Sequence, residues 1–382
     1  MPILPRLYFA VYLLLFFGKA QEDSLHLLES QLLGQYAPHT PWLLAVILTA
    51  LAYALTTFLS KRFAKHHKST SAVYVLTAWM VTILVSLPFA SWLYLTCLTI
   101  IAAALCAASI YLQQRWETKH EGAALWHPGM SYIAFLLALS LYMGIGAAAT
   151  DVEHYEMQTA QLLHKERHNK VKHIGKEALD TSRRLVAMRA YAMGTAPGLL
   201  GDRFFDQPLE RTTDATSLLL PTDCRQELMF SADSLCKMLG AKRPTTEEQT
   251  DAEKAEAYFK RVAESRGFHP SVAADYYLCA LLANRKIDAF AQEIQRYYPR
   301  QTREQKHMPK YYAQALVMYT HLRTRPAIVY SDAATEANFK DYSDMGDSLK
   351  NAAVRNNLLR RSYGETYWWY YKEGKYAQHA SH

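Results

Sequence analysis

Residues 69–114 lack charged side chains altogether, a run of 46 residues. A helix rises about 1.5 Å per residue, so about 20 residues cross the roughly 30 Å hydrocarbon core of a bilayer. The uncharged run is therefore long enough for two membrane-spanning helices, and Pro88 lies close to its middle. This absence of charge predicts an integral membrane protein rather than a soluble one.

Charge is also scarce over the first 150 residues as a whole. They carry eight Lys or Arg and five Asp or Glu, whereas residues 151–382 carry the other 34 and 30. In the second part the two signs are interspersed, which argues against nucleic-acid binding. Glycine-rich phosphate-binding loops are absent as well. We expect a transmembrane domain over residues 1–150 and a soluble domain over residues 151–382.

Apolar segments in the first part predict four or five transmembrane helices. The first of them has only twelve uncharged residues, 7–18, a length that also suits the core of a signal peptide cleaved after Ala20. A retained short span is the alternative that we favour. The predicted spans cover residues 2–18, 41–60, 70–87, 91–112 and 129–150.

The loops between these spans differ in their content of basic residues. Seven Lys or Arg fall on one side of the predicted membrane and only Lys19 falls on the other. Basic loops stay in the cytoplasm, so this pattern predicts a multi-pass protein of the cytoplasmic (inner) membrane with a cytoplasmic N-terminus and a periplasmic C-terminal domain. The seven are Arg6, Lys61, Arg62, Lys65, Lys68, Arg115 and Lys119.

The extracytoplasmic domain is predicted to be all-α. Apolar residues recur at three- and four-residue steps over 151–195, which predicts one long helical segment, and the polar residues 240–250 are typical of a linker. Two similar passages begin at Pro270 and Pro309, a spacing of 39, each with proline at the expected start of a helix. Helix pairs at such a spacing indicate a tetratricopeptide-like α-solenoid, with a plain helical bundle as the alternative.

Two histidines are the best candidates for a metal site. His164 and His168 lie four residues apart on a predicted helix and would share one face. A zinc protease motif needs glutamate directly after the first histidine, and Lys165 stands there instead. We therefore expect a solvated basic helix and no metal or other cofactor.

Three cysteines fall in the extracytoplasmic domain: Cys224, Cys236 and Cys279. A disulfide would persist outside the cytoplasm, but three thiols leave one unpaired. On one continuous helix the first two would lie about 18 Å apart, beyond disulfide reach. The sequence leaves their pairing open and offers no histidine context for a catalytic thiol.

An acidic pair, Glu22 and Asp23, follows the first apolar segment on the predicted outer side. Its position resembles that of an acidic residue in C-type membrane glycosyltransferases, which also carry an extracytoplasmic C-terminal domain. The resemblance implies a base or metal ligand for a lipid-linked sugar phosphate. Those enzymes have more spans than this chain, and an acidic pair in an outer loop is also ordinary.

Aromatic residues are concentrated in the predicted helical repeats and near the C-terminus. Tyr and Trp combine a large contact area with a polar tip, so they suit a surface that binds a protein, peptide or sugar. For the last cluster, the alternatives are a belt at the membrane interface and a helix that seals the end of the array. The candidate partner-binding residues are Tyr276, Tyr277, Tyr311, Tyr312, Tyr367, Trp368 and Trp369.

Three passages carry a resemblance to a known family: residues 184–192 with 198–205 after them, 309–316, and 364–371. In these passages the chain resembles an uncharacterised bacterial family of multi-span membrane proteins with a C-terminal helical-repeat domain of unknown function. The resemblance implies the same general architecture and brings no catalytic residues with it.

The sequence as a whole favours a non-enzymatic function. We expect a membrane-anchored scaffold, or a subunit of an envelope membrane complex, that binds a protein partner through its helical domain. The alternative is a transferase of envelope glycan or lipid assembly that uses Glu22 or Asp23.

Overall fold

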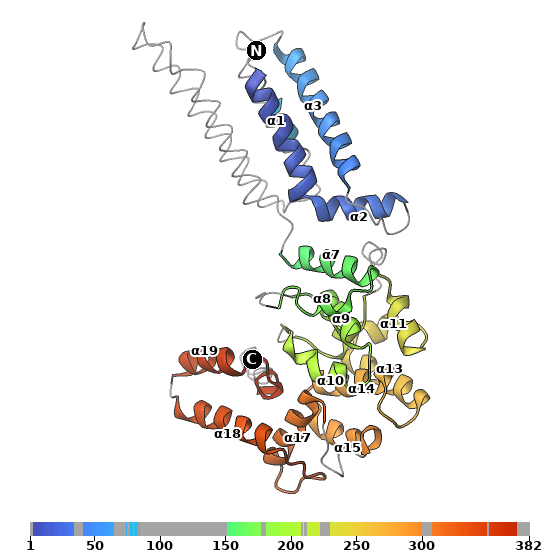
Figure 1. Cartoon of the computed structure of the whole chain (residues 1–382), viewed down its shortest axis with the longest axis vertical. Coiled ribbons are helices and arrows are strands. Elements are labelled where there is room, and N and C mark those ends of the chain that lie inside the picture. Colours follow the sequence, from blue (N-terminus) through green and yellow to red (C-terminus); the bar gives the residue numbers. More distant parts are fainter. Residues whose placement is uncertain are drawn as a thin grey trace. The chain divides into compact units, whose positions relative to one another are not determined.

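The computed structural model describes residues 3–33, 41–64, 151–176, 181–207, 209, 212–221, 230–299, 308–349 and 351–372, together with seven single positions between 74 and 84. The described residues form helices and turns, and no strand occurs among them. The chain divides into two compact units, Met1–His154 and Tyr155–His382. Figure 1 labels their helices.

The described residues of the first unit before residue 65 form three α-helices: α1 (Ile3–Leu15), α2 (Glu22–Leu33) and α3 (Trp42–Ala64). The π-helical turn Phe16–Ala20 continues α1, so the chain stays helical through the position where a signal peptide could be cleaved. Gln21 closes this turn by donating its N–H to the carbonyl of Phe16. The predicted first span, residues 2–18, thus falls on α1 and the turn that follows it.

Helix α3 is the one helix of the described part that is long and apolar enough to cross a membrane. The stretch Trp42–Phe63 has 22 residues and a mean hydropathy of 2.1. It includes all but the first residue of the predicted span at residues 41–60. Lys61 and Arg62 lie in the last turn of α3, where cations are favoured by the helix dipole. The predicted spans at 91–112 and 129–150, and most of the one at 70–87, lie outside the described residues.

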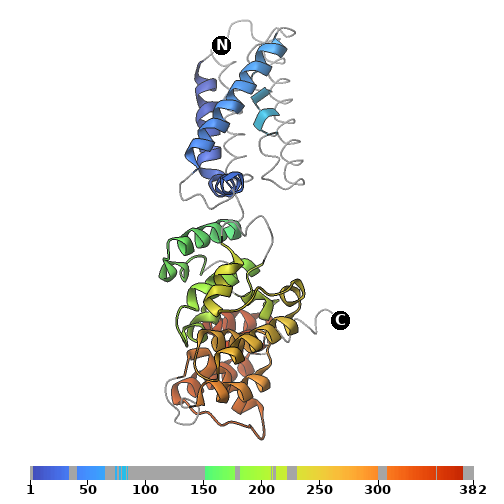
Figure 2. The same ribbon diagram turned by 90° about the vertical axis from the view of Figure 1, so that its right-hand side faces the viewer.

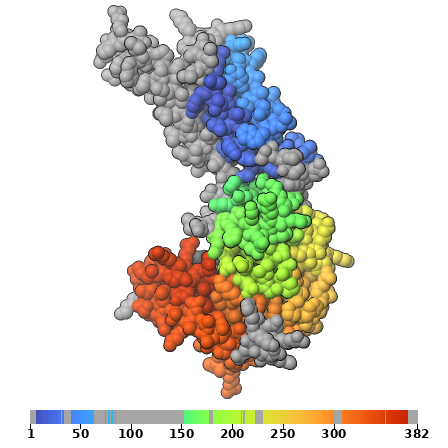
Figure 3. Space-filling model, in the orientation of Figure 1, coloured from blue at the N-terminus to red at the C-terminus, as the bar shows by residue number. Residues whose placement is uncertain are grey.

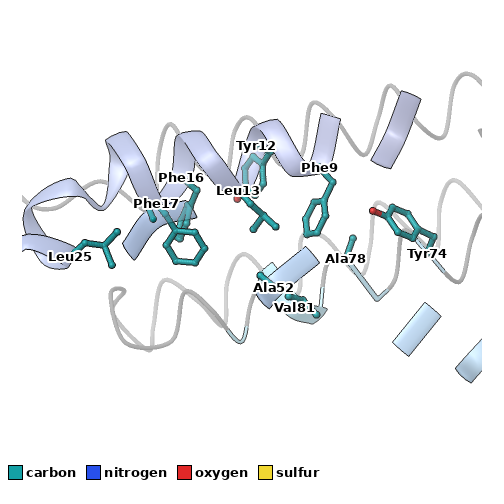
Figure 4. Close-up of a cluster of buried hydrophobic side chains, with 11 residues drawn as sticks. Phe9, Tyr12, Leu13, Phe16, Phe17, Leu25, Ala52, Tyr74, Ala78 and Val81 are labelled. Carbon is teal, nitrogen blue, oxygen red and sulfur yellow. The ribbon is translucent and has the colours of Figure 1, made fainter. Parts of the chain in front are cut away.

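Apolar side chains of α1 meet those of α3 in a buried cluster (Figure 4). Phe9, Tyr12 and Phe16 recur at three- and four-residue steps along α1 and into the turn that follows it. The ring centroids of Phe9 and Tyr12, and those of Tyr12 and Phe16, lie 6.1 Å apart. Ala52 of α3 and the described residues Ala78 and Val81 complete the contact. The cluster fixes the first helix against the candidate span.

The first half of the second unit is built from short helices joined by turns. They are α7 (Asp151–His164), which begins just before the unit boundary, α8 (His168–Val171), α9 (Arg183–Met193), α10 (Leu199–Arg203), α11 (Ala232–Leu239) and α12 (Thr246–Thr250). The single helix predicted over 151–195 is wrong. Glu166 and Gly175 have positive φ, and Ser182 caps a new helix, so the chain turns twice within that range.

The remaining helices follow one another as packed neighbours. They are α13 (Ala252–Arg266), α14 (Val272–Ala283), α15 (Ile287–Tyr297), α17 (Lys310–Leu322), α18 (Ala333–Ser348) and α19 (Ala352–Tyr363). Each contacts the next along the chain, and Figure 2 shows them from the side. Pro309 is the N-cap of α17, and Pro270 lies two residues before the start of α14, which Ser271 caps.

The predicted linker at residues 240–250 is partly helical. Thr245 and Glu248 form a capping box at the start of α12: each side chain accepts a hydrogen bond from the other residue's backbone N–H. This reciprocal arrangement satisfies two N–H groups that a helix N-terminus otherwise leaves free. The polar composition of the segment therefore encodes a short capped helix as well as a connection.

Candidate functional site

The aromatic residues predicted to bind a partner gather inside the second unit. Tyr276, Tyr311, Tyr312, Tyr367 and Trp368 are fully enclosed, with no accessible side-chain surface. Tyr277 is also buried, and Trp369 is half-buried. In this arrangement all of them except Trp369 pack in the core and do not face solvent. The placement corresponds to the alternative in which the C-terminal aromatic residues seal the helical array.

A buried carboxylate lies at the centre of these aromatic residues. Asp275 of α14 is fully enclosed, and its Oδ1 accepts hydrogen bonds from the hydroxyls of Tyr298 (2.6 Å) and Tyr312 (3.0 Å). Its Oδ2 accepts one from the backbone N–H of Gly198 (2.6 Å). Three donors from three separate segments therefore converge on one side chain. We call Asp275, Tyr298, Tyr312, Cys279 and the Gly198 N–H the Asp275 cluster.

Burial changes the protonation of this cluster. Loss of hydration raises the pKa of Asp275 to about 6, and its three hydrogen bonds only partly oppose that change. Burial also raises the pKa of the Cys279 thiol well above its ordinary value; its Sγ lies 3.7 Å from the hydroxyl oxygen of Tyr312. The thiol is therefore kept neutral. All four side chains of the cluster are buried.

Two glycines allow the loop before α10 to approach the cluster closely. Gly198 has a φ of +84°, a conformation that favours glycine, and it presents its N–H to Asp275. A Cβ atom on Gly201 would lie 2.6 Å from Cζ of Tyr312, closer than any real contact. Both positions thus require glycine for the loop to seat against α14 and α17.

A second aromatic cluster surrounds Phe205. Its ring lies about 5 Å from those of Tyr311 (5.1 Å), Tyr367 (5.2 Å) and Tyr370 (4.9 Å). The Tyr311 hydroxyl donates to the carboxylate of Asp206, which also accepts from Nζ of Lys310 at 2.8 Å. These contacts join the C-terminal residues 367–370 to the segment after α10. The tyrosine hydroxyls therefore form hydrogen bonds inside the domain.

The last two helices differ from this core because they remain largely exposed. We call α18 and α19 the C-terminal hairpin. In α19 Leu359 is the buried residue, whereas Val354 and Leu358 are 47% and 42% exposed. In α18 the buried residues are Phe339 and Tyr342, which pack on the ring of Trp368. Figure 3 shows the open surface of this hairpin in red.

The acidic pair considered for catalysis lies in the first turn of α2. Glu22 is 3.7 Å from Nζ of Lys19, and Asp23 Oδ2 is 2.7 Å from Nδ1 of His154 within the first unit. Carboxylates are favoured at a helix N-terminus by the helix dipole, so their position needs no catalytic role.

The two histidines considered for metal binding make ring contacts. His164 packs edge-on against Phe230, with ring centroids 6.1 Å apart, and His168 lies 6.0 Å from Tyr191. His164 ends α7 and His168 begins α8, so the two do not share the helix face that their spacing predicted. Within the described ranges, no group of three or more His, Cys, Asp or Glu is arranged to hold a metal ion.

The described cysteines are reduced. Cys236 and Cys279 are both buried free thiols, so no disulfide joins them. Burial raises the pKa of Cys236 as well, which suppresses its thiolate form. Cys224 lies outside the described residues.

Asp275 is a site residue that the sequence reasoning missed. It is the one charged residue in the otherwise apolar and aromatic stretch Val272–Ala283. A lone carboxylate in such a stretch must be hydrogen-bonded or neutralised when the helix is buried, which is the signal that could have identified it.

Comparison with known proteins gives one match. A family of unknown function (DUF6057) matches residues 232–373, from the start of α11 to just beyond the aromatic residues 367–371. No curated protein and no solved structure matches the chain. The match contains the Asp275 carboxylate and the C-terminal hairpin, and it agrees with the resemblance to an uncharacterised family. It assigns no activity.

Proposed function

We propose that this protein is a membrane-anchored scaffold, or a subunit of an envelope membrane complex, whose C-terminal helical domain binds another protein outside the cytoplasm. The single observation that carries the proposal is the contrast within the second unit. Its titratable cluster around Asp275 is sealed, whereas the final helix pair exposes Val354 and Leu358. Val354 and Leu358 are one helical turn apart on α19, and we propose that they form part of a surface for protein contact.

The membrane anchor is the second part of the proposal. Helix α3 has the length and hydropathy of a span, and Lys61 and Arg62 end it. The uncharged run at 69–114 supports further spans, and the basic loop that begins at Lys61 supports a cytoplasmic location for that loop. We therefore propose a multi-pass arrangement with a cytoplasmic N-terminus and a periplasmic C-terminal domain.

The packing of successive helices in the second unit supports partner binding. The helices from α13 to α19 each contact the next one along the chain, which is the arrangement that α-solenoids extend into a long surface. Such a surface recognises proteins or extended peptides through many modest contacts and needs no reactive group. The neutral, buried state of Cys236 and Cys279 fits this use.

Affinity purification of the full-length protein in mild detergent, followed by mass spectrometry, tests the proposal. We expect a protein that co-purifies in constant ratio with the chain. Glu22→Gln and Asp23→Asn serve as controls, because in a scaffold they leave both partner recovery and cellular function unchanged. Recovery of the chain alone with a bound polyprenyl lipid, and loss of function in either variant with normal insertion, would instead favour the transferase alternative.

A further inference from the structure

The two helices of the C-terminal hairpin carry opposite charges of equal size. Helix α18 has four acidic side chains and one basic side chain, a net charge of −3, and α19 has three arginines and no acidic side chain, a net charge of +3. Within the part of the chain that the structure describes, none of these eight side chains forms an ion pair. The residues are Glu336, Lys340, Asp341, Asp344 and Asp347 in α18, and Arg355, Arg360 and Arg361 in α19.

The hairpin is antiparallel and keeps one face of each helix for its own packing. Gly346 of α18 lies against Leu359 of α19, and the rings of Tyr342 and Tyr363 are 5.4 Å apart, so later residues of α18 meet earlier residues of α19. Phe339 and Tyr342 form the inward face of α18. This leaves the other faces of both helices to solvent.

Those outward faces match each other in size and charge. Ala334, Ala337 and Asp341 recur at i, i+3 and i+7 and share one side of α18. On α19 a matching stripe, i, i+4 and i+7, is formed by Val354, Leu358 and Arg361. Both stripes run from apolar to charged in the chain direction over the same seven-residue distance. At the first two positions of the stripes, alanines on α18 match larger apolar side chains on α19. At the third position, Asp341 matches Arg361.

We propose that a second copy of this chain docks on the C-terminal hairpin, so that α18 of each protomer packs alongside α19 of the other. Because the hairpin is antiparallel, a two-fold axis perpendicular to its helices makes α18 parallel to the other protomer's α19. In that register Val354 and Leu358 lie on the small residues Ala334 and Ala337, and Arg361 lies beside Asp341. The same contact is made twice, as a two-fold interface requires.

Charge complementarity selects a second copy over an unrelated partner. A partner surface of one sign would attract one helix of the hairpin and repel the other, whereas the hairpin itself presents both signs in equal amount. The interface would also cover Leu358 and Val354, which are exposed in the single chain. This inference rests on the proposed function and deepens it, because it names a second copy of the chain as the protein that contacts the exposed surface of the hairpin.

Paired charge reversals in the full-length protein test the inference. One variant reverses the acids of α18 (Asp341→Lys with Asp344→Lys), and the other reverses the bases of α19 (Arg360→Glu with Arg361→Glu). By native mass spectrometry in detergent, we expect the wild type to be a dimer and each variant alone to lose its dimer fraction by about tenfold or more. When the two variants are co-expressed with different tags, they should co-purify as a heterodimer. Glu253→Lys, at an exposed position of α13, should leave the dimer intact.

Three results would overturn the inference. A wild-type protein that is monomeric at every concentration has no such interface. Variants that dimerise as well as the wild type place the contact elsewhere, including the membrane unit. A pair of reversed variants that fails to associate while the hairpin binds a different protein shows that the surface serves a heterologous partner, which would leave the scaffold function standing.

Discussion

Helices α14 and α17 precede α18 and α19 in the chain, and the two pairs bury very different fractions of their residues. Every residue of α14 from Ala273 to Ala283 is buried, including the carboxylate of Asp275. In α19 only Leu359 is buried. When a helix is buried on every side, its polar side chains must find hydrogen-bond partners inside the domain. A helix with one buried residue leaves its other side chains exposed and free to contact another molecule. The comparison separates a stabilising core from an available surface.

The largest expected effect that tests this comparison concerns the pH dependence of the core. Asp275 has a pKa of about 6 in the fold and about 3.9 in an unfolded chain, so the fold binds the proton more tightly. Its contribution to stability is therefore complete below pH 4 and is lost as the pH rises through 6. The free energy of unfolding should fall by about 2 to 3 kcal/mol between pH 4 and pH 7 from this group.

Pulse proteolysis in urea measures this effect on the purified protein. Asp275→Asn cannot titrate, so its stability relative to the wild type should improve as the pH rises from 4 to 7. A constant difference between the two proteins over that range would show that Asp275 keeps an ordinary pKa.

The second expected effect concerns the attachment of the C-terminal hairpin. Leu359→Ala removes the one buried side chain of α19 and should destabilise that helix locally by about 2 kcal/mol. Leu358→Ala is the matched control, because Leu358 is adjacent to Leu359 and is 42% exposed in the single chain. Hydrogen exchange of α19 peptides, measured at a concentration where the chain is monomeric, should accelerate in the first variant alone. Equal acceleration in both would contradict the assignment of the buried face.

A smaller effect distinguishes two tyrosines of the core. The Tyr312 hydroxyl donates to Asp275, and Tyr312→Phe should cost about 1.5 kcal/mol in the free energy of unfolding. Tyr276 is equally buried, but its hydroxyl has no hydrogen-bond partner in the part of the structure that is described. Tyr276→Phe should therefore be neutral or slightly stabilising by urea unfolding. The comparison fails if the two substitutions cost the same.

The smallest expected effect comes from helix caps. Ser271 caps the buried helix α14, and Asn351 caps the exposed helix α19. Replacement of either by alanine should cost about 1 kcal/mol. The cost should appear in global unfolding for Ser271→Ala and only in faster local hydrogen exchange for Asn351→Ala. A global effect of Asn351→Ala would mean that α19 belongs to the cooperative core.

Some of this architecture could be predicted from the sequence, because local patterns encode it. The apolar run of α3 and the proline-headed passages before α14 and α17 lie where helices were expected. The break of the helix predicted over 151–195 depends on the positive φ of Glu166 and Gly175, which an apolar periodicity does not reveal. Sequence patterns indicate helices well and their interruptions poorly.

The candidate site was less predictable, because burial is a tertiary property. From the sequence alone, Tyr276 and Tyr312 were predicted to bind a partner at the surface, yet both are buried. Asp275 became visible only when Gly198, far away in sequence, was seen to donate to it. The charges of α18 and α19 could be counted from the sequence, but it could not be predicted that they form no ion pairs with the other described residues.

Photochemical cross-linking in cells tests the central claim most directly. An azidophenylalanine placed at Leu358 lies on the exposed hairpin, and the same residue at Tyr276 lies in the sealed core. The account predicts a discrete adduct to another protein chain from position 358 and none from position 276. Adducts from position 276 with none from position 358 would contradict it, because the aromatic core would then be the contact surface.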